Sequence, residues 1–469
     1  MRHATDHNLT LEERDKRFFF HPSTSISDLL ANGPKIMDRA AGVRVTDIDG
    51  RSYIDAAGGL WCVNVGYGRQ EIVEAITRQA SRMAFYHSFS TMSNEPAILL
   101  AERVMGMVPE GMARVFFGNS GSDANDTNIK LVWYYNNLRG KPQKKKIISR
   151  RRAYHGVSIG GGSATGLPIN HDHFDLPLPQ FRHARPVDQY REKPEGMDEE
   201  GFAAMLAAEL EAMIEAEGPE TVAAFIAEPV MGTGGVLVPP KGYFERVRAI
   251  CDRHDMLLIA DEVICGFGRL GSMFGSVHYG FRPDLMTLAK GLSSGYQPIS
   301  GSVVSERVWQ VLEATAHTLP GFGHGYTYSA HPVCAAAALA NLDILEREDL
   351  TANAARVGPY LRARMQAVLG GEEIVGDIRG EGLMIGVELV ADRATKRAFD
   401  PALKVGPRTM KAGMARGILC RALPHRDVLA FSPPLILTEA EADEIVAALA
   451  GAVAQVRDEL MAKGDWRPS

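Results

Sequence analysis

Two apolar segments near the middle of the chain each end in a single charged residue. The first covers residues 257–260 and is followed by Asp261, and the second covers residues 285–289 and is followed by Lys290. Short apolar runs bounded by polar residues are typical of buried strands in a parallel sheet. A charge that closes such a strand lies at the carboxyl edge of the sheet, where open α/β folds bind their ligands. The two runs therefore predict an α/β fold with Asp261 and Lys290 at a ligand site.

The chemistry of these two residues narrows the choice of ligand. A buried lysine beside a carboxylate can lose its proton and attack a carbonyl group. An aspartate can hold a proton on a ring nitrogen, and together the two residues match what pyridoxal 5'-phosphate (PLP) requires of its enzyme. On their own, Lys290 and Asp261 are equally compatible with a structural ion pair between strand ends. The neighbouring segments therefore decide between the two interpretations.

The composition of the chain argues against several other classes of protein. With 469 residues, of which 45% are hydrophobic, the chain can form a large core and two or more domains. A net charge of -6 gives no reason to expect a nucleic-acid partner. The five cysteines are scattered without a CxxC pair, which argues against disulfides and a metal site and favours a reducing compartment. Because the first twenty residues are highly charged and no apolar stretch is long enough to span a bilayer, we expect a cytoplasmic protein without a signal peptide or membrane partner.

The order of the predicted elements divides the chain into three segments. Residues 1–65 contain a hairpin with an Asp-Gly turn, and we expect them to form an N-terminal arm and part of a small domain. Residues 66–332 alternate between strands and helices, as in a large domain with a mostly parallel sheet. Residues 333–469 are expected to form a C-terminal small domain, in which residues 378–389 are a turn and a strand and a capped helix comes last. The strands predicted for the middle segment are residues 114–117, 146–149, 223–227, 257–260, 285–289 and 299–304, and the helices between them include residues 96–107, 123–138, 201–217 and 243–254.

A small polar turn precedes the helix predicted at residues 123–138. Ser120, Gly121 and Ser122 form this turn, directly after a predicted strand. Unpaired N–H groups of a first helical turn and the serine hydroxyls can bind a phosphate, helped by the helix dipole. In isolation, an ordinary N-cap is the simpler explanation. Neither a Walker loop nor a dinucleotide-binding motif is present in the turn.

Two further segments follow predicted strands. Tyr154-His155-Gly156 comes after the strand at residues 146–149, and Glu228 comes after the strand at residues 223–227. An aromatic ring at such an edge could stack on a cofactor, and a glutamate there is expected to line the site. The alternatives are a buried tyrosine with a satisfied hydroxyl and a glutamate in a surface loop.

A phosphate turn, an aromatic residue, a glutamate, an aspartate and a lysine thus follow one another at strand ends. This ordered set resembles the class III aminotransferases, which are PLP enzymes of fold type I. The resemblance covers nearly the whole chain, and its most specific part is the Asp-Glu-Val and Gly-Phe-Gly-Arg run at residues 261–269 with Lys290 downstream. It implies a large domain with a mostly parallel seven-stranded sheet and a smaller α+β domain built from both termini. The other matching segments are residues 120–125, 154–156, 228–230, 289–291 and 325–329.

The resemblance also implies roles for individual residues. Lys290 would form the Schiff base with the cofactor and then move a proton, while Asp261 would keep the ring nitrogen protonated. Val263 and Tyr154 would enclose the cofactor ring. A homodimer with shared active sites is implied, with a tetramer left open, and Thr327 of one subunit would reach the phosphate in the other. The cofactor-binding residues predicted in this way are Ser120, Gly121, Ser122, Tyr154, His155, Gly156, Glu228, Asp261, Val263, Lys290, Tyr326 and Thr327.

Two positions bear on the substrate. Family members that use 2-oxoglutarate with ornithine or γ-aminobutyrate carry an arginine that pairs with the glutamate matching Glu228, whereas this chain has Ala430 at that position. Arg421 instead matches an arginine of the pyruvate-using ω-aminotransferases. In those enzymes this arginine turns toward the carboxylate of one substrate and moves aside for an apolar substituent of another. A surface salt bridge is the alternative for Arg421, and a core position is the alternative for Trp61, which matches an aromatic pocket wall. The predicted substrate-binding residues are Trp61, Phe89, Tyr154, Thr233, Arg421 and Ser23.

Together these features predict that an amino group passes from a primary amine or ω-amino acid to pyruvate, giving alanine, by a ping-pong mechanism. A 2-oxoglutarate-dependent aminotransferase, an aminomutase and a decarboxylase are alternatives from the same family, because PLP supplies the same electron sink to each. A non-catalytic PLP-fold protein is the alternative from a different class, and the intact Lys290 argues against it. The motifs leave open the amine donor, the stereopreference and the choice between dimer and tetramer.

Overall fold

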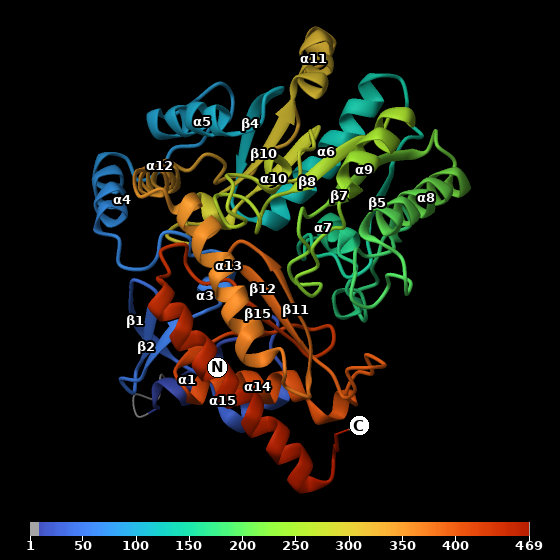
Figure 1. Ribbon diagram of the computed structural model, residues 1–469. Coiled ribbons are helices and arrows are strands. Elements are labelled where there is room, and N and C mark those ends of the chain that lie inside the picture. The colour runs from blue at the N-terminus through green and yellow to red at the C-terminus, as the bar shows by residue number, and fades with distance from the viewer. Residues whose placement is uncertain (1–8, 469) are drawn as a thin grey trace.

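Three β-sheets organise the computed structural model, which describes residues 9–468 (Figure 1). In this part of the chain the largest sheet has seven strands in the order β4-β10-β9-β8-β7-β5-β6. Strand β10 runs antiparallel to both of its neighbours, and the other neighbouring strands are parallel. The predicted α/β fold with a mostly parallel seven-stranded sheet is therefore confirmed. The strands are β4 (Met112–Gly118), β5 (Lys146–Arg150), β6 (Phe181–Ala184), β7 (Val222–Ala227), β8 (Leu257–Asp261), β9 (Leu285–Leu288) and β10 (Ser300–Ser305).

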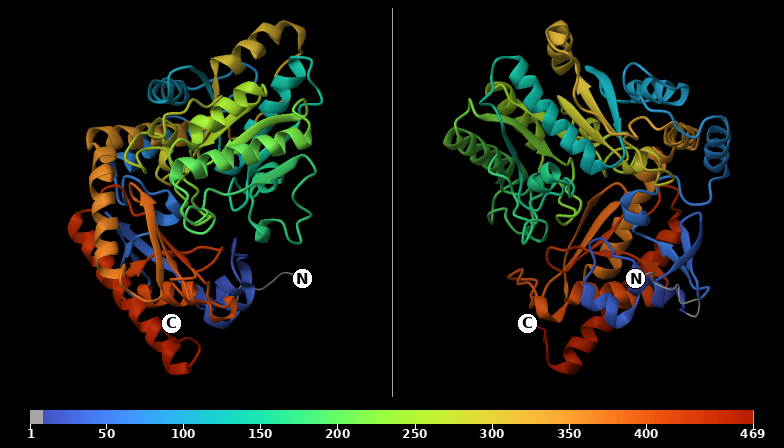
Figure 2. Two further views of the ribbon diagram at one scale, coloured as in Figure 1. Left: turned by 45° about the vertical axis from the view of Figure 1, so that its right-hand side comes forward. Right: turned by 180° about the vertical axis from the view of Figure 1, so that it is seen from behind.

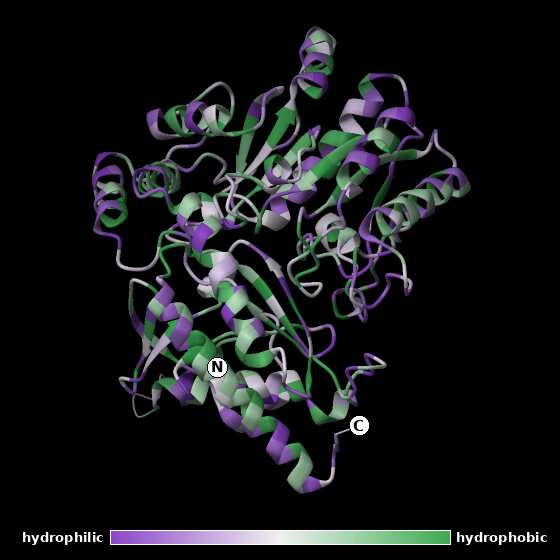
Figure 3. Cartoon of the chain, in the orientation of Figure 1, coloured by the Kyte–Doolittle hydropathy of each residue, from purple (hydrophilic) through white to green (hydrophobic). Residues whose placement is uncertain are grey.

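The helices cover both faces of this sheet, which explains why its central strands are apolar throughout. Every residue of β7, β8 and β9 is buried. Successive side chains of a strand point to opposite faces, so Ile226 packs in the cluster that contains α6, whereas Phe225 packs in the cluster that contains α8 and α9. Figure 2 shows α6 on one side of the sheet and α8 and α9 on the other. The strands of the sheet are accordingly more hydrophobic than the outer faces of the helices in Figure 3.

Two smaller sheets, of four strands each within the described residues, form the other half of the molecule. The first has the order β1-β2-β3-β13, and its parallel β3–β13 pair joins the two ends of the chain. The second has the order β11-β12-β15-β14. This arrangement agrees with the expected smaller α+β part built from both termini, while the exact domain boundaries stay a prediction. The strands are β1 (Met37–Ala41), β2 (Arg44–Asp47), β3 (Ser52–Asp55), β11 (Val375–Glu381), β12 (Met384–Leu389), β13 (Ile418–Leu419), β14 (Arg421–Ala422) and β15 (Val428–Phe431).

One segment of this half differs from the expectation. Residues 378–389 were expected to hold a turn followed by one strand, but they hold the end of β11, a tight turn and all of β12. Gly382 makes the turn with a φ of +52°, a conformation that glycine adopts without steric cost. Residues on both sides of this glycine are therefore free to pair as an antiparallel hairpin.

The longest helix closes the chain, and its start is as predicted. Thr438 caps α15 by accepting a hydrogen bond from Glu441 N, while the Glu441 carboxylate accepts one from Thr438 N. No helix of the described chain is long and apolar enough to cross a membrane. The helices are α1 (Leu11–Phe18), α2 (Ile26–Asn32), α3 (Gly58–Trp61), α4 (Gln70–Arg82), α5 (Glu95–Met107), α6 (Gly121–Leu138), α7 (Ile159–Ala164), α8 (Glu199–Glu217), α9 (Tyr243–Arg253), α10 (Gly275–His278), α11 (Glu306–Thr315), α12 (Pro332–Arg347), α13 (Leu350–Leu369), α14 (Val405–Ala415) and α15 (Glu439–Lys463).

Candidate active site

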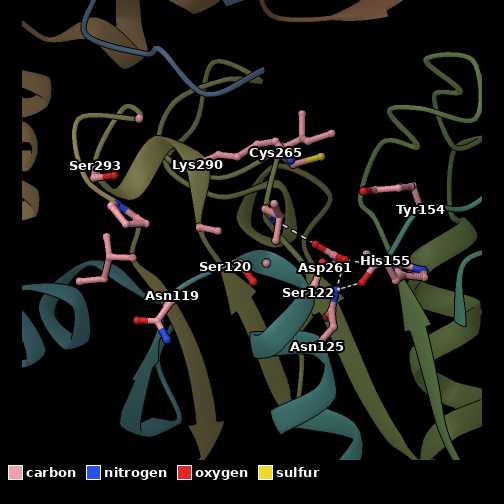
Figure 4. Close-up of a pocket in the computed structure, with 18 of the residues that line it drawn as sticks. Asn119, Ser120, Ser122, Asn125, Tyr154, His155, Asp261, Cys265, Lys290 and Ser293 are labelled. Atoms are coloured by element: carbon pink, nitrogen blue, oxygen red, sulfur yellow. Dashed lines mark hydrogen bonds and ion pairs between the residues drawn. The ribbon is translucent and has the colours of Figure 1, made fainter. Parts of the chain in front are cut away.

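A cavity of about 360 Å³ lies where several strands of the large sheet end (Figure 4). Asp261 closes β8 and Lys290 comes two residues after β9, so both reach the cavity from adjacent strands. The N-terminus of α6 and the segment after β5 supply the opposite walls. The predicted site residues that line this cavity are Ser120, Gly121, Ser122, Tyr154, His155, Gly156, Glu228, Asp261, Val263 and Lys290.

Lys290 is half-buried at the wall of the cavity. Burial lowers the pKa of the Lys290 ammonium group, and the nearby Asp261 carboxylate opposes that shift. The backbone at Lys290 has a φ of +40°, which is strained for a residue with a side chain. Asn341 holds the turn by donating to the carbonyls of Gly291 and Leu292, at 2.9 and 3.0 Å. The lysine is therefore fixed in place by α12 and has a reduced preference for the protonated form.

Asp261 is buried and accepts hydrogen bonds from several N–H donors. Its Oδ1 accepts from Val263 N at 3.1 Å, and its Oδ2 accepts from Asn125 Nδ2 at 2.8 Å. His155 Nδ1 also lies 2.8 Å from Oδ2, and it must be the donor if Asp261 is ionised, because a carboxylate only accepts. Both oxygens of Asp261 are thus held by neighbouring groups. His155 Nε2 is buried and has no hydrogen-bond partner within residues 9–468, so the contact with Asp261 is made through Nδ1.

The turn before α6 has the geometry of an anion site. Ser120 is the N-cap of α6, and the Asp123 carboxylate accepts from the backbone N–H groups of Asn119 and Ser120. The amides of Gly121 and Ser122, the first two of the helix, have no acceptor within the helix. These two N–H groups lie at the N-terminus of α6, where the helix dipole favours a negatively charged ligand.

Gly156 packs tightly against this turn from the segment after β5. Its φ is +114°, and a Cβ atom there would lie only 2.5 Å from Ser122 Oγ and 2.8 Å from Ser122 Cα. Only glycine allows this approach. Gly156 therefore determines how closely the segment that carries Tyr154 can lie to the anion site.

The residues around the cavity fit PLP by their chemistry. A lysine amine can bind an aldehyde, a buried carboxylate can bind a protonated ring nitrogen, and free helix amides can bind a phosphate. All three lie on one cavity, whose walls also carry Tyr154 and Val263. The ordinary N-cap and the structural ion pair therefore do not account for the whole arrangement.

Glu228 is held by backbone amides. Its Oε1 accepts from Tyr154 N at 3.2 Å, and its Oε2 accepts from Gly232 N at 2.8 Å. It forms no ion pair in the part of the chain that the structure describes. Burial raises the pKa of both the Glu228 carboxyl and the Tyr154 phenol. The Glu228 carboxylate thus binds the backbone at Tyr154 and Gly232, while the Arg150 guanidinium donates only to the Glu228 carbonyl oxygen.

Arg421 lies directly opposite Ala430 in the antiparallel pair of β14 and β15. Its side chain is half-buried, and burial lowers the pKa of the Arg421 guanidinium, an effect that the Tyr154 phenol opposes. Across residues 9–468, Arg421 makes neither a hydrogen bond through its side chain nor an ion pair. The Arg421 charge also acts on Lys290, whose pKa it lowers further. A surface salt bridge is therefore not what the structure shows for Arg421.

Like Arg421, the remaining predicted residues are not among those that line the cavity. Trp61 is only 2% exposed and packs in an apolar cluster with Val230 and Ala430, and Thr233 is also buried. Phe89, Ser23 and Thr327 are exposed. The Tyr326 hydroxyl donates to Asp123 O at 3.0 Å, which ties its loop to the N-terminus of α6. The substrate and cofactor roles of these residues stay predictions.

Several residues of the cavity were not predicted from the sequence. Asn125 lies within the matched segment at residues 120–125, and an amide side chain one helical turn after Gly121 was the available signal for it. The loop at residues 293–299 offered no comparable signal, because tertiary contacts set its course. The residues not predicted are Asn119, Asn125, Ile264, Cys265, Ala289, Ser293, Gly295, Gln297, Pro298 and Ile299.

Comparison with known proteins places this site in context. The family model described as aminotransferase class-III matches residues 30–453. A diaminobutyrate–2-oxoglutarate transaminase of Halomonas elongata is 51% identical over 459 residues, which cover 97% of this chain and 98% of that protein. The mitochondrial gamma aminobutyrate transaminase 1 of Solanum lycopersicum is 44% identical over 414 residues, which cover 88% of this chain and 80% of that protein. The crystal structure of the omega transaminase from Pseudomonas jessenii in complex with PMP has a TM-score of 0.94 and 45% identity, covering 97% of this chain and 99% of that one.

Proposed function

The chain belongs to the class-III aminotransferases, and from this premise we propose that it transfers an amino group from a primary amine or ω-amino acid to pyruvate. It is a PLP-dependent enzyme, as the family is and as the site chemistry fits. The acceptor is the part of the function that the family alone does not determine. Alanine is the product that we expect to leave in the second half of a ping-pong reaction.

One observation supports pyruvate most directly, and it is the position of Arg421. An arginine without an ion-pair partner among the described residues lies within electrostatic range of Tyr154 and Lys290, although it is not one of the residues that line the cavity. Position 430, directly across the strand pair, carries only the methyl group of Ala430. A site with one such arginine suits one carboxylate, and pyruvate has one whereas 2-oxoglutarate has two.

We assign the following roles to residues of this chain. When bound, PLP supplies an aldehyde that takes the amino group and a cationic ring that withdraws electrons from the reacting carbon. Lys290 Nζ moves a proton away from the substrate carbon, which its lowered pKa favours. Asp261 holds the proton on the ring nitrogen, and the amides of Gly121 and Ser122 hold the phosphate. Tyr154 and Val263 flank the ring and exclude water from it.

Two exposed segments support a homodimer with shared sites. Phe89 is 43% exposed and packs against Gly325, two residues before Thr327. Phe85, Tyr86 and Met92 add further exposed apolar surface beside Phe89. Apolar surface of this kind marks protein interfaces. We therefore propose that Phe89 and Thr327 complete the site of a second copy of the chain, with a tetramer left open.

A second candidate is a 2-oxoglutarate-dependent reaction. The relative from Halomonas elongata is named for 2-oxoglutarate and is 51% identical over almost the full length of both chains. The Glu228 carboxylate forms no ion pair within residues 9–468, since the Arg150 guanidinium binds only the Glu228 carbonyl oxygen. This disfavours the arrangement that pairs the carboxylate with an arginine. Diaminobutyrate, γ-aminobutyrate and other amines remain candidate donors for either acceptor.

Steady-state assays with both acceptors test the proposal. A panel of amines is offered with pyruvate and, in parallel, with 2-oxoglutarate, and the alanine and glutamate formed are measured. We expect efficient formation of alanine and at least about tenfold lower kcat/KM with 2-oxoglutarate. Efficient glutamate formation with no alanine would reject the pyruvate assignment. Release of CO₂ or isomerisation of the amine without net transfer would instead indicate a decarboxylase or an aminomutase.

We also propose a cytoplasmic location. The five cysteines are free thiols, and four of them are buried. Cysteines that stay as free thiols favour a reducing compartment.

A further inference from the structure

A series of hydrogen-bonded polar side chains, those of Asn125, Thr287 and Asn128, leads from Asp261 into the protein interior. Asn125 and Asn128 come from α6, and Thr287 comes from β9. Each is at most 1% exposed. The register of β8 and β9 places Thr287 directly beside Asp261. Only Asn125 lines the cavity, so the other two cannot reach a bound molecule directly.

The donor and acceptor in each of these hydrogen bonds follow from the backbone carbonyl of Met286, which lies at the far end of the series. Asn128 Nδ2 donates to Met286 O at 3.2 Å and to Thr287 Oγ1 at 2.8 Å. Because a carbonyl only accepts, the Asn128 amide must present its nitrogen to this side. Thr287 Oγ1 therefore accepts from Asn128 and gives its own proton to Asn125 Oδ1, at 2.6 Å.

The second half of the series transmits this orientation to the carboxylate. With Asn125 Oδ1 occupied by the Thr287 hydroxyl, both N–H groups of the Asn125 amide face the other way. One donates to His155 O at 2.8 Å, and the other donates to Asp261 Oδ2 at 2.8 Å. If Asn125 were turned over, its oxygen would face two acceptors, the His155 carbonyl and the Asp261 carboxylate. Thr287 thus supports the orientation of Asn125 that the His155 carbonyl and the Asp261 carboxylate also require.

We propose that Thr287 and Asn128 are positioning residues that act through Asn125 to hold the Asp261 carboxylate aimed at the ring nitrogen of PLP. This inference rests on the proposed role of Asp261. Without the Thr287 hydroxyl, Asn125 Oδ1 loses its donor in a buried place, so Asn125 is held less firmly against Asp261. Hydrogen bonds in such a series also polarise one another, so the loss reaches Asp261 although no side-chain hydrogen bond among the described residues joins it directly to Thr287.

A comparison of two cofactors isolates the effect on the ring nitrogen. The apoenzyme is titrated with PLP and with 1-deaza-PLP, a carbon analogue in which CH replaces the ring nitrogen, and both dissociation constants are measured. Thr287→Val keeps the shape of the side chain and removes its hydroxyl, whereas Thr287→Ser keeps the hydroxyl. We expect Thr287→Val to weaken PLP binding about tenfold and binding of the analogue less than twofold. Thr287→Ser is expected to stay close to the native protein with both cofactors.

Further variants separate this effect from a general loss of structure. Asn128→Ala removes the far end of the same series and is expected to weaken PLP binding about threefold without affecting the analogue. Ser302→Ala is the matched control. Ser302 also donates from a buried strand position to α6, at 3.0 Å to Ala124 O, but it is not part of the hydrogen-bond series that ends at Asp261. It should leave the ratio of the two dissociation constants unchanged. Asp261→Asn marks the ratio that is reached when the interaction with the ring nitrogen is lost.

The outcomes distinguish this inference from the function on which it rests. Equal weakening of PLP and of the analogue by Thr287→Val would show that Thr287 only supports the fold, and the inference would be wrong. An unchanged ratio in both Thr287→Val and Asn128→Ala, with a reduced ratio in Asp261→Asn, would overturn the inference but keep the role of Asp261. If the native protein itself bound PLP and the analogue equally well, the role of Asp261 would fail and the inference with it.

Discussion

Replacing Arg421 with methionine is expected to separate the two halves of the reaction. Methionine keeps an unbranched side chain of similar length but removes the charge and the hydrogen-bond donors. Arg421 forms no ion pair among the described residues, so its removal leaves no buried acid without a partner. The fold should therefore be retained, and the loss should concern only substrates with a carboxylate at the reacting carbon.

The size of the effect follows from the surroundings of Arg421. A hydrogen bond to a charged group contributes about 1.5–3 kcal/mol. Arg421 is half-buried, so solvent screens part of this interaction, and we take about 2 kcal/mol. This corresponds to a loss of roughly 30-fold in kcat/KM for pyruvate and for alanine.

Single-turnover measurements of each half-reaction provide the assay. The amine half is followed with 1-phenylethylamine, which has no carboxylate, and with alanine, and the acceptor half is followed with pyruvate. We expect Arg421→Met to slow the alanine and pyruvate reactions and to change the 1-phenylethylamine reaction by less than twofold. Arg426→Met, an exposed arginine of the same hairpin, is the charge-matched control and should change none of them. Equal losses in all three reactions, or no loss with pyruvate, would refute the role given to Arg421.

Three further predictions concern the site and its support. Lys290→Ala should lower kcat at least about 10³-fold with little change in stability, which turnover and thermal denaturation can check; near-normal turnover would end the assignment of Lys290. Gly156→Ala should destabilise the protein by about 2–4 kcal/mol and weaken PLP binding, because the new Cβ would meet Ser122. Gly140→Ala is the control, since Gly140 has a φ of +71° and open space around it. It should cost only about 1 kcal/mol in a denaturant titration. Equal costs for the two alanines would remove the argument from close packing. Burial raises the pKa of Glu262 from an ordinary 4.5 to about 7. Between these two pH values the folded state keeps the proton that the unfolded state loses. The free energy of unfolding should therefore fall by up to about 3 kcal/mol as the pH rises from about 4.5 to 7. Glu262→Gln should lose that part of the slope in denaturant titrations across this range, and an unchanged slope would contradict it.

The large sheet could be predicted from the sequence because its strands are buried on both faces. Six of its strands were predicted with ends within two residues of those observed, since a run such as residues 222–227 has no polar interruption. The edge strand β6 was not predicted, because Phe181–Ala184 is short and its two middle residues, Arg182 and His183, are polar and only half-buried. The hairpin of β11 and β12 was predicted only in part, since Gly380 and Gly382 suggest a turn but not which residues pair across it.

The cavity lining followed from the sequence to the extent that it lies at strand ends. Asp261 ends a strand, and Lys290, Glu228 and Tyr154 each follow one, so one rule places all of them at the same edge. Residues such as Asn128 and Thr287 lie within elements, and their hydrogen bonds depend on which face of α6 packs on β9. That packing is a tertiary property, so a single sequence does not reveal it.

Covalent labelling tests most directly whether Lys290 anchors the cofactor. The native protein is saturated with PLP and reduced with borohydride, which turns the lysine–aldehyde link into a stable amine, and the digested protein is examined by tandem mass spectrometry. The account predicts a phosphopyridoxyl group on the peptide that contains Lys290, and no such group at this position in the Lys290→Ala protein. A phosphopyridoxyl group on another lysine of the native protein, with Lys290 unmodified, would contradict it.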